Sequence, residues 1–398
     1  AQVLRIIEED LHKITLFRKF SSGEKKLLRY TGPRFSLIFY DRDYKNYKLT
    51  WEVTIRPNLI EECKYYVDAL RGSIIHKFNN TKSNGPALGT GIDLNGMTRT
   101  FDVYLKDGTY YLYNVAESMF DPVTDQGFIV TLNANNTSTF VLDFSYITST
   151  DNTWLHQQAA ISAHCNAAKT YVYFDTTFNW KSFNGKGGNI ISIVNVAEED
   201  GTSMENAFWN GQAVFYGNGG ENYKPLAGAL DVTAHEIGHA VVSATANLEY
   251  YGQPGAINES FADIFACMVD RDDWQIGEDV TRPGYSPSGA ARDLSNPHNL
   301  GDSTKPYWQP EHMSESFLGS RDNGGVHINS GIINYAYYLY ANSVGKNDAE
   351  QVFFRALTHY LTKTSGFIEL RIAAIQTARD LFGEFSKEAT NDEEAFEQ

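Results

Sequence analysis

Alternating hydrophobic and polar residues occupy most of the first half of the chain and predict β-strands. Within residues 1–85 the pattern covers three segments, the last of which reads as strand, turn and strand: FSLIFYD, KLTWEVTIR and YYVDALRGSIIHKFN. Runs rich in β-branched and aromatic residues continue between about residues 86 and 227: TRTFDVYL, TYYLYNVA, GFIVTLN, TFVLDFSY, NIISIVNV and QAVFYGNG. One helical segment interrupts them, QQAAISAHCNAAKTYVYF. We expect its His164 to be a packing residue, because no acid or histidine lies at ligand spacing from it.

From Gly228 onward the apolar residues recur at helical spacing instead. Two predicted helices come first, LDVTAHEIGHAVVSATA and GAINESFADIFA, and a long irregular stretch over residues 273–325 follows them. Three more helical segments complete the chain: INSGIINYAYYLYANS, AEQVFFRALTHYL and FIELRIAAIQTARDLF. The segment NNTKSNG at 79–85 is polar and rich in turn residues, so it reads as an exposed linker. The pattern predicts an N-terminal module over 1–85, a β-rich part over 86–227 and a helical part over 228–398.

Charge and cysteine usage narrow the classes of protein. The chain has 398 residues and a formal net charge of −16, which argues against nucleic acid or an anionic membrane as partners. No apolar run is long enough to span a bilayer. The cysteines Cys63, Cys165 and Cys267 are odd in number and lack ligand spacing, so we expect separate buried thiols.

The candidate chemistry centres on His235-Glu236-Ile237-Gly238-His239. Residues four apart share one face of a helix, so His235 and His239 can present two imidazoles to one metal ion. Glu236 lies beside them, close enough to act on a metal-bound water. This is the H-E-x-x-H zinc pattern, although taken alone it could be an exposed helical turn with two solvated histidines.

Two further segments support the zinc interpretation. Glu259 can supply the carboxylate ligand of a His2Glu site, and Asp263, one helical turn later, can orient a ligand histidine through its other ring nitrogen. In the glycine-rich run DNGGVH, His327 is a candidate oxyanion stabiliser and Asp322 its orienting acid, whereas the alternative is an ordinary loop histidine.

These motifs resemble the thermolysin family of secreted zinc endopeptidases. The matching segments follow the family's order over roughly residues 86–398: NAFWNG, LDVTAHEIGH, GAINESFADIF, DWQIGEDV, RDLSNP, DNGGVHINSGI and FFRALTHYLT. The resemblance implies an α+β fold with a β-rich lobe, a helical lobe and the zinc helix at the floor of the cleft between them. It also implies that residues 1–85 are a small α/β module, the C-terminal part of a propeptide, with processing between about Asn79 and Leu88.

The resemblance assigns roles around the metal. It implies zinc held by His235, His239 and Glu259, a metal-bound water activated by Glu236, and an oxyanion stabilised by Tyr250 and His327. It further implies substrate contacts from Asn206, Ala207 and Arg292, and an apolar pocket for the residue after the scissile bond. The pocket residues are Tyr223, Leu226, Val232, Ile276, Val280 and Ala291. Such a pocket favours bulky hydrophobic residues, and Ala291 stands where the family commonly has leucine, so aromatics should fit better.

Calcium is the part of the resemblance that the sequence matches least well. Counterparts of the family's paired-calcium ligands are Asp231, Asp270, Asp273 and Glu278. The loop between Asp270 and Asp273 is short, however. We therefore expect one structural calcium ion. The implied partners are peptide and protein substrates and the chain's own propeptide, and we expect a secreted monomer.

Two rival functions stay open at this stage. One is an aminopeptidase on a related scaffold, of which Met204-Glu205-Asn206 is a faint echo that we interpret as coincidence, because NAFW overlaps it directly. The other is a binding or inhibitory protein that keeps a zinc site without turnover. The intact Glu236, Tyr250 and His327 argue against the second rival.

Overall fold

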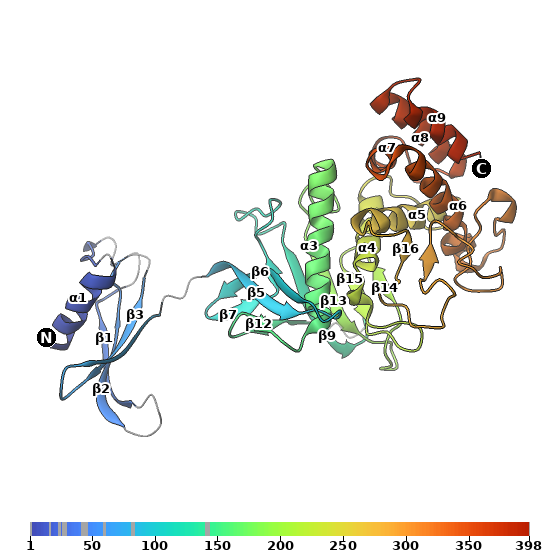
Figure 1. Ribbon diagram of the computed structural model, residues 1–398. Coiled ribbons are helices and arrows are strands. Elements are labelled where there is room, and N and C mark those ends of the chain that lie inside the picture. Colours follow the sequence, from blue (N-terminus) through green and yellow to red (C-terminus); the bar gives the residue numbers. More distant parts are fainter. Residues whose placement is uncertain are drawn as a thin grey trace. The chain divides into compact units, whose positions relative to one another are not determined.

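The computed structural model describes residues 2–15, 17–22, 25, 30–40, 47–58, 61–80, 84–139 and 144–397. The chain forms two compact units (Figure 1). The first comprises Ala1–Asn84 with Lys106–Gly108, and the second Gly85–Leu105 with Thr109–Gln398. Residues 81–83 of the predicted linker lie outside the described residues.

The first unit packs a helix on an antiparallel sheet. The described strands follow the order β1 (Arg34–Tyr40), β2 (Lys48–Ile55), β3 (Cys63–Asp68) and β4 (Ile74–Asn79), as the alternating pattern predicts. Helix α1 (Gln2–Ile14) buries Ile7 and Leu11 against apolar residues of β2 and β3. The strand pattern did not predict α1, although its apolar residues recur at helical spacing.

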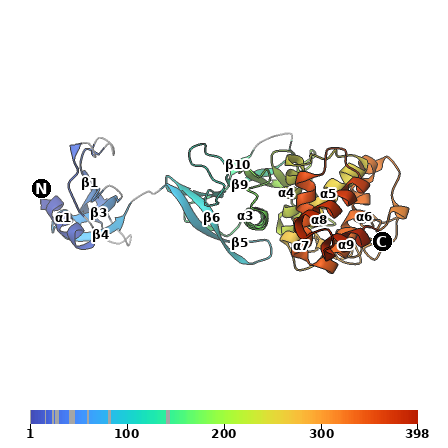
Figure 2. The ribbon, with the colours of Figure 1, turned by 90° about the horizontal axis from the view of Figure 1, so that it is seen from above.

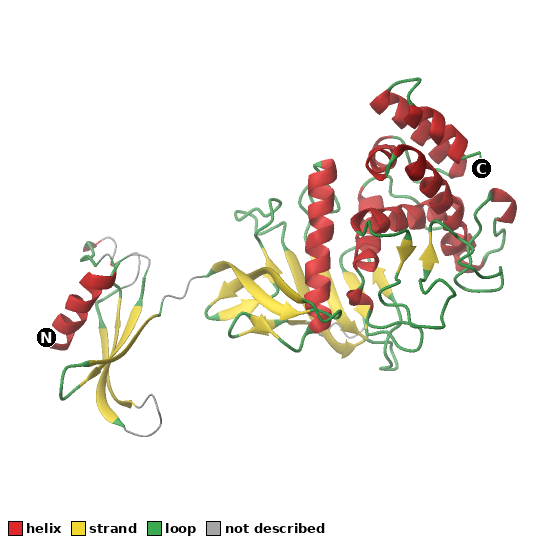
Figure 3. Cartoon of the chain, viewed as in Figure 1, coloured by secondary structure: helices red, strands yellow, loops and turns green. Residues whose placement is uncertain are grey.

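The β-rich part of the second unit contains two main sheets among its described residues (Figure 3). One has the order β11-β7-β6-β5-β12, and the other runs β10-β9-β13-β15-β14 with β8 paired to β9. The strand bounds are β5 (Gly85–Ile92), β6 (Thr98–Lys106), β7 (Thr109–Tyr111), β8 (Tyr113–Asn114), β9 (Ile129–Thr137), β10 (Ser145–Tyr146), β11 (Thr148–Ser149), β12 (Thr153–Trp154), β13 (Ile190–Val196), β14 (Ala207–Trp209) and β15 (Val214–Gly217). Strand β14 pairs with β15 at the end of its sheet.

Helix α3 (Gln158–Phe178) lies against β9 and β13 and carries His164 into the core. The imidazole is buried, with Nδ1 3.0 Å from the Thr131 hydroxyl and Nε2 2.9 Å from the Asp102 carbonyl oxygen. Burial lowers the pKa of His164 to about 4. The expected packing role is confirmed.

The helical part gathers α4 to α9 in one group (Figure 2), and α4 carries the H-E-x-x-H motif. Its elements are η1 (Leu226–Gly228), α4 (Leu230–Ala244), α5 (Gly252–Val269), β16 (Gln275–Ile276), β17 (Arg292–Asp293), η2 (Met313–Glu315), α6 (Arg321–Val344), α7 (Lys346–His359), α8 (Phe367–Phe382) and α9 (Lys387–Ala395). Helix α9 was not predicted. Helices α4 and α5 pack so closely at Gly238 that a Cβ atom there would lie 2.9 Å from the Cα of Ala262. Glycine inside the H-E-x-x-H motif therefore lets the two ligand-bearing helices meet.

Two expectations from composition can be checked on the described residues. Cys63, Cys165 and Cys267 carry free thiols, of which Cys63 and Cys267 are buried and Cys165 is partly exposed. Within the described ranges, no helix combines the length and the apolar character that crossing a bilayer requires.

Candidate zinc site and substrate cleft

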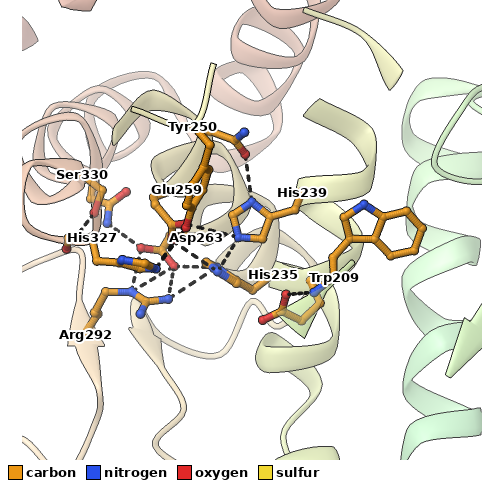
Figure 4. A network of polar contacts seen from close by, with 12 residues as sticks. Trp209, His235, His239, Tyr250, Glu259, Asp263, Arg292, His327 and Ser330 are labelled. Carbon is orange, nitrogen blue, oxygen red and sulfur yellow. Dashed lines mark hydrogen bonds and ion pairs between the residues drawn. The ribbon is translucent and has the colours of Figure 1, made fainter. Parts of the chain in front are cut away.

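Three predicted zinc ligands converge from two helices. His235 and His239 project from the same face of α4, and their Nε2 atoms lie 3.0 Å apart. Glu259 on α5 places Oε2 3.6 Å from His235 Nε2 and Oε1 3.5 Å from His239 Nε2 (Figure 4). Among the described residues, these three side chains form the group whose ligand atoms all lie within 4.8 Å of one another.

The outer nitrogens of both imidazoles are held by neighbours on α5. His235 Nδ1 lies 2.9 Å from Asp263 Oδ1, and His239 Nδ1 lies 2.8 Å from Asn258 Oδ1. When each Nδ1–H donates to its oxygen, the Nε2 lone pairs face each other and Glu259. Glu259 Oε2 is buried and, among the described residues, has no hydrogen-bond partner. This donor set and the orphaned carboxylate oxygen fit a tetrahedral zinc ion.

Asp263 is the centre of a buried ionic network. Arg292 donates to Asp263 from Nε at 2.9 Å and from Nη2 at 2.6 Å, and Asn334 donates from Nδ2 at 2.8 Å. Burial would raise the pKa of Asp263, but the charge of Arg292 and the contact with His235 lower it well below its usual range. Asp263 is therefore an anion beside Nδ1 of His235.

The environment of Glu259 also favours its charged form. Burial raises the pKa of this carboxyl, yet the surrounding His239, His327, His235 and Arg292 together lower it to about 2. Burial lowers the pKa of His239, but the negative charges of Glu259 and Glu236 raise it by more. The pKa of His239 is therefore above its ordinary value. The site thus concentrates negative charge where a cation would bind.

Glu236 points away from the ligand group toward the edge strand β14. Its Oε2 accepts a hydrogen bond of 2.9 Å from the backbone N–H of Trp209 (Figure 4). The residue is 6% exposed and lines the cleft. A carboxylate held between the zinc helix and the strand can reach a water in the cleft without serving as a ligand.

Tyr250 and His327 complete the opposite wall. The Tyr250 hydroxyl donates to Glu259 and lies 3.1 Å from His327 Nε2. Burial and the adjacent Glu259 raise the pKa of Tyr250 well above its usual range, so the phenol remains a proton donor. His327 Nδ1 lies 2.6 Å from Asp322 Oδ1.

The DNGG run explains how Asp322 reaches His327. Its four residues have positive φ values of 54°, 48°, 82° and 82°, in the left-handed region that favours Asn, Asp and Gly. The resulting turn folds Asp322 back so that its Oδ2 also accepts the His327 backbone N–H at 2.9 Å. The ring is thereby fixed toward Tyr250.

A cleft of about 730 Å³ runs past these groups. All nine predicted substrate-binding residues line it, together with His235, Glu236, His239, Tyr250 and His327. Those nine are Asn206, Ala207, Tyr223, Leu226, Val232, Ile276, Val280, Ala291 and Arg292. The other lining residues were not assigned roles by sequence reasoning, and Glu205 and Asn258 are two of them. Asn258 directly precedes a ligand in NES, whereas Glu205 had only the discounted Met-Glu-Asn echo as a signal.

The predicted calcium residues lie near the start of α4 and after α5. Asp231 is buried and accepts backbone hydrogen bonds from Gly277 and Val232, yet burial and the charge of Asp270 raise its pKa to about 7. Burial and Asp231 raise the pKa of Glu278 to about 9. Asp273 instead accepts the backbone N–H of Gln275 at 2.8 Å.

Comparisons with known proteins identify the family of the chain. Residues 88–243 match the family profile described as thermolysin metallopeptidase, catalytic domain, and residues 246–398 match that of the alpha-helical domain. The chain therefore belongs to the thermolysin metallopeptidase family. It is 38% identical to Neutral protease B of Bacillus subtilis, covering 92% of this chain and 67% of that protein. It is 41% identical to Bacillolysin of Brevibacillus brevis, covering 81% of this chain and 59% of that protein.

Two further proteins, one extracellular enzyme and one precursor, are also similar to this chain. Extracellular elastase of Staphylococcus epidermidis is 36% identical, covering 92% of this chain and 69% of that protein. The structure of the precursor of protealysin, a metalloproteinase from Serratia proteamaculans, matches with a TM-score of 0.61 and 29% identity. That match covers 68% of this chain and 86% of the other. The chain thus spans about 59% to 69% of the lengths of the three curated relatives named.

Proposed function

We propose that this chain is a secreted zinc endopeptidase that cleaves peptide bonds on the N-terminal side of bulky hydrophobic residues. The observation that carries the proposal is the convergence of His235, His239 and Glu259, with Glu236 beside them in a cleft. Family membership and the name of the Staphylococcus epidermidis relative support catalysis and export.

The residues divide the chemistry of hydrolysis between them. Zinc held by His235, His239 and Glu259 would act as a Lewis acid that polarises the substrate carbonyl and acidifies water. Glu236 accepts the proton of the attacking water and delivers it to the departing amine. Tyr250 and His327 donate hydrogen bonds to the oxyanion of the tetrahedral intermediate. His327 can donate from Nε2 in its imidazolium form, whose Nδ1–H is accepted by Asp322.

Substrate binding follows from the edge strand and the apolar wall. Strand β14 is the last strand of its sheet among the described residues, and its outer edge can pair with an extended peptide, which gives affinity independent of side chains. We assign Asn206, Ala207 and Arg292 to contacts with the substrate backbone. The pocket that begins at Tyr223 then receives the side chain after the scissile bond, and its apolar lining favours Leu, Ile, Val or Phe.

The test is hydrolysis of a blocked peptide with an internal Gly–Leu bond, by this chain and by Glu236→Ala. Cleavage that is lost with a chelator and with the substitution supports a metallo-endopeptidase, and the blocked terminus excludes an aminopeptidase. Zinc binding without any cleavage, before or after removal of residues 1–85, would instead leave a binding protein.

We also propose that residues 1–85 are a propeptide segment removed between about Asn79 and Leu88. The N-terminal segment of the first compact unit ends at Asn84, and the protealysin match is to a precursor. N-terminal sequencing of fully active secreted enzyme tests this. A start at Ala1 would contradict it.

One structural calcium ion is proposed at Asp231, Asp270, Asp273 and Glu278. Burial and Asp231 raise the pKa of Glu278, and Glu278 Oε2 is buried and lacks a hydrogen-bond partner among the described residues. A hard cation would satisfy both carboxylates. Calcium should therefore raise the Tm of the chain but not that of Asp231→Asn, and equal increases in both would contradict the site.

A further inference from the structure

The cleft contains one acidic side chain that the proposed mechanism does not use. Glu205 directly precedes the Asn206 and Ala207 contacts of the edge strand and lines the cleft. Its Oε1 accepts the backbone N–H of Glu221, and its Oε2 accepts that of Asn222 at 3.1 Å. A Cβ atom at Gly220 would lie 2.2 Å from Oε1. The backbone of residues 220–222 therefore wraps the carboxylate and fixes its position.

The carboxylate keeps capacity for another donor. Each oxygen has two acceptor directions, so two backbone donors leave half of the capacity unused. Nearby cationic groups are committed elsewhere: Arg282 Nε donates to the carbonyls of Gly220 and Tyr223 at 2.9 and 3.2 Å, and Lys224 Nζ donates to that of Asp279 at 2.8 Å. Across the described ranges, no salt bridge involves Glu205.

The place of Glu205 in the cleft identifies the substrate residue that it faces. Glu236 meets the edge strand at Trp209, which marks the position of the reacting bond. Glu205 lies four residues earlier, two positions before Ala207 begins β14, and so beyond the other end of that strand. The loop that holds it leads directly into Tyr223, which lines the apolar pocket for the residue after the scissile bond. The carboxylate is therefore beyond that pocket, on the leaving-group side.

We propose that Glu205 makes the enzyme prefer arginine or lysine at the second residue after the scissile bond. This rests on the proposed endopeptidase function. A fixed carboxylate with free acceptor directions can form a charge-assisted hydrogen bond with a guanidinium or ammonium group. The substrate amine that an aminopeptidase binds lies on the other side of the reacting bond, so the position of Glu205 does not suit that role.

The experiment measures kcat/KM for blocked peptides that share a Gly–Leu bond and differ only at the next residue, Arg, Gln or Glu. The full chain is compared with Glu205→Gln, and with Glu221→Gln as a control of equal charge change. Glu221 is exposed, neighbours the same loop and does not line the cleft. For the unaltered chain we expect Arg to exceed Gln by about three- to tenfold, with Glu the poorest.

The ratio of kcat/KM for the Arg peptide to that for the Gln peptide should fall toward one in Glu205→Gln. The same ratio should stay unchanged in Glu221→Gln. The ratio should also shrink in the unaltered chain as NaCl is raised, because salt screens partly exposed charges. This second measurement does not depend on the variant folding. Cleavage of the Gln peptide with no preference for Arg would overturn the role of Glu205 alone. Failure to cleave any peptide, both before and after removal of residues 1–85, would overturn the endopeptidase function and this proposal with it.

Discussion

Asp263 Oδ1 lies 2.9 Å from His235 Nδ1, on the side of the ring opposite the nitrogen that faces His239. The same carboxylate is paired with Arg292 at 2.6 Å. One buried anion therefore connects a proposed zinc ligand with a proposed substrate-binding residue. Replacing it should affect metal binding and the cleft together.

The first prediction concerns zinc affinity. Asp263→Asn keeps the shape of the side chain but removes the charge that orients His235 and strengthens it as a donor. Zinc should bind about 10- to 100-fold more weakly, as measured by competition with a chromogenic chelator. Asn334→Ala is the control, because it removes a 2.8 Å hydrogen bond to Asp263 and leaves the carboxylate and its contact with His235 in place. Equal losses in the two variants would show that Asp263 acts only through packing.

The second prediction separates oxyanion stabilisation from metal binding. Tyr250→Phe removes the hydroxyl beside His327 and leaves the ring, so kcat should fall about 100-fold with little change in KM. Zinc affinity should stay close to that of the unaltered chain. Tyr251→Phe removes a hydroxyl from the next residue, which does not line the cleft, and should leave kcat unchanged. A rise in KM at constant kcat would indicate a role in substrate binding instead.

The local part of the site could be predicted from sequence. The four-residue spacing of His235 and His239 fixes their common face once the segment is helical, and the same rule links Glu259 with Asp263. Most strands and helices were also predicted, because their apolar residues recur with the period of the element that they form. Helix α1 was missed among neighbouring strand patterns, and α9 was missed because its sequence KEATNDEEA is mostly polar.

Contacts between distant segments could not be predicted from spacing alone. Asn334 meets Asp263 from the middle of α6, in a tyrosine-rich stretch that reads only as core. Likewise, Glu205 accepts hydrogen bonds from backbone N–H groups of a loop. Every residue except proline has such a group, so the sequence does not indicate which ones bind Glu205. The roles of Tyr250 and Arg292 came from family resemblance, because each residue alone would pass for a surface side chain.

The third prediction tests the shape of the apolar pocket. Ala291 Cβ lies 3.6 Å from the position that a Cβ on Gly277 would take, so this wall is built from small residues. The chain should cleave peptides with Phe after the scissile bond at least about as well as those with Leu. Ala291→Leu should narrow the pocket and reduce kcat/KM for Phe by about tenfold relative to Leu. A strong preference for Leu in the unaltered chain would contradict the wider pocket.

The fourth prediction concerns stability at acid pH and uses His164. Burial lowers the pKa of His164 in the folded state from 6.5 to about 4, so below pH 6.5 the unfolded chain binds a proton that the folded chain does not. Stability should therefore fall with pH between about 6.5 and 4, by about 2 kcal/mol from pH 7.5 to 5 for this group. His164→Gln should be less stable at neutral pH, yet its stability should depend less steeply on pH.

Both chains would carry Glu236→Ala to prevent self-cleavage, and the free energy of unfolding would be measured by denaturant titration at each pH. His156→Gln provides the matched control, since His156 is exposed and the same substitution there should leave the pH dependence unaltered. The difference between His164→Gln and its parent should be larger at pH 7.5 than at pH 5. A constant difference would mean that His164 has the same pKa in the folded and the unfolded chain, which would contradict the prediction.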